Sequence, residues 1–210
     1  MTKATCFTTL AMLFALGCSE APGGSGGSGG TGGAADAVFV DAEWNLTCPA
    51  DSAVDCGTLA PQTCLGDLGQ RSFVGEHGQL ACTGHPISAI CEAIERADGA
   101  RIVTLEANVG DEFAFELQAA DVDADGIVVQ TACNVTIIED GVPYDMGTCG
   151  QNAPSLEQPC QLSNVSVEGH EVVFDVQCNS ILSSVTALSF DAGALGGGPT
   201  TIRFANCIGF

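Results

Sequence analysis

Residues 133–149 read CNVTIIEDGVPYDMGTC, and this stretch decides the fold class. Apolar and β-branched residues lead into an Asp140-Gly141 pair, which is a turn signal for an antiparallel hairpin. Cys133 and Cys149 are equidistant from Gly141, so in a hairpin folded there the two cysteines face each other near the separation that a disulfide requires. The stretch predicts a β-hairpin with the disulfide Cys133–Cys149.

A second hairpin follows the same rule. Cys160 and Cys178 are equidistant from Gly169, in the turn Glu168-Gly169-His170, which predicts the disulfide Cys160–Cys178. The alternative in both hairpins is a turn that shifts the register by one residue and sends the two side chains to opposite faces.

Around these hairpins the apolar residues have a period of two, which is typical of strands. The segments are residues 102–105, 113–117, 127–129, 135–138, 172–176 and 201–204. They predict six to eight strands in an immunoglobulin-like β-sandwich over residues 100–210.

Residues 34–99 are predicted as a Cys-rich N-terminal segment with one short helix. Ile87, Ile90, Cys91 and Ile94 recur at helical spacing between Pro86 and Gly99, and we expect them in the core. The fold class is therefore mainly all-β: a disulfide-stapled antiparallel β-sandwich with one short helix, in which residues 34–99 and 100–210 form one unit.

The cysteines indicate an oxidising compartment. Of the twelve, ten remain without Cys6 and Cys18, and the absence of any C-x-x-C argues for five disulfides over a zinc site. Beyond the two hairpin pairs, six cysteines leave 15 connectivities open: Cys48, Cys56, Cys64, Cys82, Cys91 and Cys207. Cys207, expected in the last strand, is predicted to reach back to the N-terminal segment and join the two parts.

Residues 1–17 have the layout of a secretory signal, with Lys3 before an apolar stretch that is too short to span a bilayer. Ala15-Leu16-Gly17-Cys18 resembles a bacterial lipobox, although Ala15 stands where Leu is usual. The resemblance implies cleavage before Cys18, lipidation of its thiol and anchorage to a membrane, and Ser19 implies the outer membrane. Ordinary secretion is the alternative. Residues 18–33 are then a lipidated, Gly-rich tether that behaves as a random coil.

The charge excludes one class of partner. Without residues 1–17 the chain has four arginines against 26 carboxylates, a net charge of −22, which repels nucleic acid. Such a surface is either a solvated exterior or one that attracts divalent cations or basic partners.

Asp121, Asp123 and Asp125, followed by Gly126, form the motif with the most specific chemistry. Alternate carboxylates in a tight loop can converge on Ca²⁺, as in the first half of an EF-hand. The second half is missing, because Ala132 stands where a bidentate Glu belongs. A calcium site would need backbone carbonyls, water or a distant carboxylate such as Asp111, Glu112 or Glu139. The alternative is an acidic turn without a metal.

Residues 110–115 and 120–126 resemble the strand-and-turn signature of bacterial immunoglobulin-like and cadherin-like repeats. That resemblance implies a spacer or adhesion module that often binds calcium, although this chain has one copy and many cysteines. The whole layout, from the lipobox to Cys207, resembles the Cys-rich lipoproteins of myxobacteria. This second resemblance implies no activity.

Three functions are weighed. The first is a noncatalytic, surface-tethered interaction or adhesion module with a protein or polysaccharide partner, and the second is a structural envelope lipoprotein without a ligand. A large exposed apolar patch would favour the first. The third, an unrecognised hydrolase, would require a deep pocket that holds His77, His85 or His170 beside a nucleophile.

Overall fold

The computed structural model describes residues 36–49, 69–81, 83–129 and 133–210. The predicted signal, Cys18, the tether, Ala132 and the cysteines 56, 64 and 82 lie outside these residues. The segment Ala34–Phe210 forms one compact unit. Its described part is all-β, with no helix, and accordingly no described helix could cross a membrane.

Twelve strands form one mostly antiparallel sheet. They are β1 (Phe39–Thr47), β2 (Gln70–Glu76), β3 (Ile87–Glu95), β4 (Arg101–Val109), β5 (Phe113–Val122), β6 (Val128–Val129), β7 (Asn134–Glu139), β8 (Val142–Gly150), β9 (Cys160–Glu168), β10 (Glu171–Leu182), β11 (Ser189–Gly193) and β12 (Thr200–Ala205). The order is β11-β1-β12-β10-β9-β8-β7-β5-β4-β3, with β2 beside β1 and β6 beside β5. Nine strands lie after residue 100 instead of six to eight, partly because the five residues of β11 lack a clear alternating pattern.

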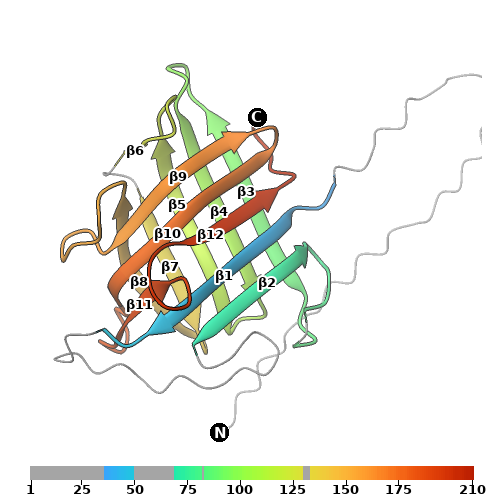
Figure 1. Ribbon diagram of the computed structural model, residues 1–210. Helices are drawn as coiled ribbons and strands as arrows, with labels where there is room; N and C mark the ends of the chain where they lie inside the picture. The colour runs from blue at the N-terminus through green and yellow to red at the C-terminus, as the bar shows by residue number, and fades with distance from the viewer. Residues whose placement is uncertain (1–35, 50–68, 82, 130–132) are drawn as a thin grey trace, which may run out of the picture. The chain divides into compact units, whose positions relative to one another are not determined.

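The sheet is arranged in two layers, which Figure 1 shows one in front of the other. The front layer contains β1, β2 and β9 to β12, and the back layer contains β3 to β8. Among the named strands of the described ranges, the hydrogen-bonded pairing that joins the two layers is a short parallel one, Cys149 with Cys160 and Gly150 with Gln161. Aromatic side chains fill the space between the layers: the ring centroid of Phe115 on β5 lies 6.0 Å from those of both Trp44 on β1 and Phe174 on β10.

The disulfide Cys133–Cys149 is present, and a β-bulge makes it possible. The turn pairs Glu139 with Val142, a register that on its own would set Cys133 opposite Thr148. Between Val135 and Ile137 the register shifts by one residue, because two residues of β8 oppose one of β7. The shift brings the two cysteines into opposition.

The disulfide Cys160–Cys178 depends on a second bulge. Here the turn pairs Glu168 with Glu171, and the register shifts by one residue between Val173 and Asp175. The extra residue lies on β9, where Asn164 has the positive φ of 50°. Both turns are therefore displaced by one residue from the symmetric hairpin that the spacing implied, and both bulges cancel the displacement.

The predicted helix between Pro86 and Gly99 is wrong. Residues 87–95 form β3, in which Ile87, Ala89, Cys91 and Ala93 face the core. Ile90 and Ile94, expected in the core, point outward and are 42% and 54% exposed. The helical spacing arose because two of the inward positions are alanines, so the larger isoleucines of the outer face completed an apparent helical stripe.

The third described disulfide, Cys91–Cys207, joins β3 to the segment that follows β12. It confirms that Cys207 reaches back to the N-terminal segment. Beside it, Ile208 pairs with Glu92 in a parallel bridge: Ile208 N–H donates to Cys91 O, and Ala93 N–H donates to Ile208 O. The C-terminal tail thus covers part of the outer edge of β3, a strand edge that would otherwise be open to other chains.

A buried ion pair connects the layers at another place. Arg71 on β2 is 0% exposed and donates through Nε and Nη2 to both oxygens of Glu139 on β7, which is 5% exposed. The guanidinium also donates to Gln70 O and lies 5.2 Å from the ring centroid of Phe113. Burial raises the pKa of Glu139, and the hydrogen bond from Arg71 lowers it by a smaller amount.

We predict that Arg71→Met destabilises the fold by about 3–5 kcal/mol, because it leaves a buried carboxylate without its partner. The double variant Arg71→Met/Glu139→Leu should recover most of that loss, because it removes both charges. Denaturant unfolding measures the two differences. A single variant within about 1 kcal/mol of the unmodified chain would contradict a structural role for the pair.

Tyr144, the one tyrosine of the chain, provides a spectroscopic test of the packing. Burial, and to a smaller extent the charge of Glu139, raise the pKa of Tyr144 to about 12. A raised pKa means that stability present below the ordinary tyrosine pKa is lost as the pH rises toward 12. We therefore predict that tyrosinate absorbance appears near pH 12 in the folded chain and near pH 10 in denaturant. A single ordinary titration in both states would contradict the buried position.

Candidate functional site

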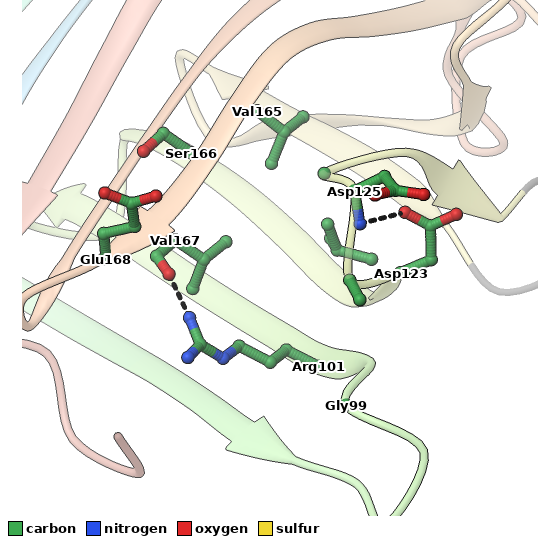
Figure 2. A pocket seen from close by; sticks show the side chains of 11 residues that line it. Gly99, Arg101, Asp123, Asp125, Val165, Ser166, Val167 and Glu168 are labelled. Atoms are coloured by element: carbon green, nitrogen blue, oxygen red, sulfur yellow. Dashed lines mark hydrogen bonds between the residues drawn. The ribbon is translucent and has the colours of Figure 1, made fainter.

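A groove lies where the acidic turn between β5 and β6 meets β9 (Figure 2). Its volume is about 380 Å³. The residues that line it are Gly99, Arg101, Val122, Asp123, Ala124, Asp125, Gly126, Val165, Ser166, Val167 and Glu168. Two of the three predicted metal ligands, Asp123 and Asp125, are therefore at this groove.

The carboxylate of Asp123 is used within its own turn. Its Oδ1 accepts hydrogen bonds from the backbone N–H of Asp125 at 2.9 Å and of Ile127 at 2.8 Å, and the first of these is drawn in Figure 2. This arrangement is an Asx turn, in which the side chain replaces a backbone acceptor.

Asp121 is not part of that turn. It lies on β5, and its Oδ2 accepts a hydrogen bond from Arg96 Nη1 at 2.7 Å. Of the distant carboxylates considered as further ligands, Glu139 binds Arg71. Within the described ranges, no group of three or more His, Cys, Asp or Glu side chains is placed to hold a metal ion. These contacts favour an acidic turn, and calcium binding stays a prediction.

The opposite wall of the groove is a joint between the layers. Arg101 on β4 donates from Nη1 to Val167 O on β9, and its guanidinium lies 5.2 Å from the ring centroid of Phe210. A Cβ on Gly126 would lie 2.7 Å from Val165 O, and φ at this position is +79°. Only glycine fits such a close approach with that backbone conformation. Arg101 therefore joins β4 to β9, and the turn approaches β9 closely at Gly126.

The three histidines lie outside this groove. His77 Nδ1 accepts a hydrogen bond from Ala89 N–H, so this ring covers the outer edge of β3 next to the C-terminal tail. His170 Nδ1 is 3.1 Å from Cys207 O, with its ring centroid 5.1 Å from that of Phe210. His85 packs beside Gly110. Each ring contacts backbone or tail atoms, which gives the hydrolase alternative no support.

A second candidate site is an apolar surface on the outer face of the back layer. We call it the isoleucine patch, and it comprises Ile90, Ile94, Ile102 and Ile208. Their exposed fractions are 42%, 54%, 37% and 57%.

The register explains why these side chains gather. Ile94 on β3 is directly opposite Ile102 on β4, and Ile90 lies on the same face as Ile94. Ile208 is held beside Glu92, the residue midway between Ile90 and Ile94, by the bridge that follows Cys207. Exposed isoleucines are ordinary when scattered singly, whereas an apolar cluster marks an interaction surface.

Carboxylates border the isoleucine patch. Glu92 lies inside it, and Glu106 is opposite Ile90 and also opposite Glu116 on the next strand. Like charges directly opposite each other destabilise a sheet. The ion pairs found among the described residues involve other carboxylates, namely Asp98, Asp121, Glu139 and Glu171. The patch is therefore an apolar cluster with one carboxylate, Glu92, inside it and two others, Glu106 and Glu116, on the neighbouring strands.

Sequence reasoning located the acidic turn but missed the isoleucine patch. The signal was present in residues 87–95, where Ile, Ala, Cys and Ala alternate with Ser, Ile, Glu and Ile. A scan against protein-family models, a search of curated proteins and a search of solved structures each found no match to the chain. The site is therefore interpreted from its own geometry.

We predict that Asp123→Asn and Asp123→Ala differ. Asparagine keeps an oxygen that accepts both backbone hydrogen bonds, whereas alanine loses them at a cost of about 1–2 kcal/mol. Thermal unfolding of both variants, in EDTA and then in millimolar calcium, measures this. A calcium site gives another result: stabilisation of the unmodified chain by about 2–3 kcal/mol at a hundredfold excess over Kd, lost in both variants.

Proposed function

We propose that this protein is an exported, lipid-anchored and noncatalytic interaction module. In this proposal a lipid on Cys18 fixes it to a bacterial membrane, most simply the outer membrane, and the Gly-rich tether presents the folded unit to a partner. The observation that carries the proposal is the isoleucine patch, because an exposed apolar cluster distinguishes a binding module from a purely structural component.

The architecture suits display of such a surface. The patch is built on strands, and the covalent link Cys91–Cys207 holds Ile208 in place. Sites on regular elements are held more firmly than sites on loops. A partner that binds there meets a preformed surface, so little conformational entropy is lost on association.

The kind of fold also bears on the proposal. Two packed layers support the sandwich part of the fold prediction. The immunoglobulin-like comparison stays a proposal. Most of the back layer is a meander of successive hairpins, whereas immunoglobulin domains use Greek-key connections. The likeness to cadherin-like adhesion modules is likewise proposed at the level of display and binding.

The patch itself is the part of the proposal that can be tested directly. The full chain with Cys18→Ser, exported so that its disulfides form, would be immobilised and used to select peptides from a random library displayed on phage. We expect peptides that bind this chain and fail to bind the same chain with Ile94→Thr and Ile102→Thr. Both positions are solvent-exposed, and threonine keeps the β-branched shape that a strand favours.

Val185→Thr is the matched control, because Val185 is 73% exposed and lies in the loop between β10 and β11. Selected peptides should bind this control as they bind the unmodified chain. If no selected peptide depends on the isoleucine patch, while the variants unfold at the same temperature as the parent, the interaction proposal fails and a structural envelope role becomes the better account.

A further inference from the structure

The isoleucine patch also indicates the chemistry of its partner. We infer that it binds a protein segment that presents aliphatic side chains flanked by Lys or Arg. This inference rests on the proposed function and adds the class of partner.

The local charges are unbalanced in one direction. Glu92 lies within the patch, and Glu106 and Glu116 are directly opposite each other on the same outer face. Two arginines lie near the end of β3 and the start of β4, and both have other partners: Arg96 binds Asp98 and Asp121, and Arg101 donates to Val167 O. A cationic side chain from a partner would relieve the repulsion between Glu106 and Glu116 as well as pair with Glu92.

The net charge of the whole chain also favours a basic partner. The full chain has a net charge of −21, so a basic partner is attracted over a distance and steered toward the surface. The patch itself supplies the apolar contacts that give an interface most of its affinity, and charges at its border supply specificity. A partner segment therefore needs both kinds of side chain.

A second copy of this chain is a poor occupant. A symmetric interface places the same surface on both sides, so it would bring Glu92, Glu106 and Glu116 toward their equivalents. A lipid bilayer is also a poor occupant, because Glu92 would be carried into an apolar medium without a partner. Both remain measurable outcomes of the experiment below.

The experiment uses the exported full chain with Cys18→Ser and two synthetic amphipathic peptides that share one leucine pattern. One carries lysine at every polar position and the other carries glutamate. Isothermal titration calorimetry at low and at high salt measures binding. We expect the leucine–lysine peptide to bind, with an affinity that falls as salt rises, and the leucine–glutamate peptide to bind at least tenfold more weakly, since tenfold corresponds to about 1.4 kcal/mol.

Three variants separate the apolar contribution from the charge contribution. Ile94→Thr/Ile102→Thr should weaken the leucine–lysine peptide by about tenfold or more, since each substitution removes apolar contact area. Glu92→Gln should weaken it several-fold and reduce the salt dependence. Val185→Thr, exposed in a loop outside the patch, should leave the affinity unchanged.

Several outcomes would overturn the inference. If the two isoleucine substitutions leave the affinity for the leucine–lysine peptide unchanged, the acidic surface attracts cations without the patch. If both peptides bind equally and both lose affinity in the isoleucine variant, the patch binds partners regardless of charge, and the interaction proposal survives without this refinement. Patch-dependent dimerisation in analytical ultracentrifugation, or patch-dependent sedimentation with phosphatidylcholine vesicles, would instead identify a second copy or a bilayer as the occupant.

Discussion

The disulfide between Cys91 and Cys207 is the constraint on which the candidate binding surface depends. Cys91 lies in β3, the edge strand of the back layer. Cys207 follows β12, the C-terminal strand, which belongs to the front layer. The bond therefore ties the C-terminal tail to the outer edge of β3. It also positions Ile208, which completes the isoleucine patch, and it restricts access to an edge that could otherwise pair with another chain.

The two hairpin disulfides were predictable from cysteine spacing, whereas the details of their turns were not. The equal spacing of each cysteine pair around a glycine led to the right pairs, although each turn is displaced by one residue from that symmetric hairpin. In each hairpin a bulge restores the opposition of the cysteines. In residues 133–149 the local sign of the bulge is Gly147, because a glycine inside a strand often marks a bulge or a close backbone approach. A bulge depends on packing across the sheet, and the covalent bond itself selects the register that allows it.

The helix prediction failed at the place that matters most for function. Two inward positions of β3 are alanines, so the largest apolar side chains of this strand include its outward isoleucines. The pattern of residues 87–94 therefore fits a helical period as well as a strand period. Only the neighbouring strand β4, with Ile102 opposite Ile94, shows that these isoleucines form a surface. The acidic turn was easier to find, because its residues are contiguous. Its hydrogen bonds, which use Asp123 to hold the turn and Asp121 to bind Arg96, depend on tertiary structure.

Ile90, Ile94, Ile102 and Ile208 point outward and lie close together, whereas Ile87, Ile137, Ile181 and Ile202 are in the core. The most direct measurement is paramagnetic relaxation of isoleucine methyl groups by a soluble gadolinium chelate, recorded by NMR on the chain with Cys18→Ser. We expect strong relaxation of the δ1 methyl groups of the four outward isoleucines and protection of those of Ile87, Ile137, Ile181 and Ile202, which are buried. Protection of Ile90 and Ile94 would contradict the strand assignment of residues 87–95 and remove the proposed binding surface.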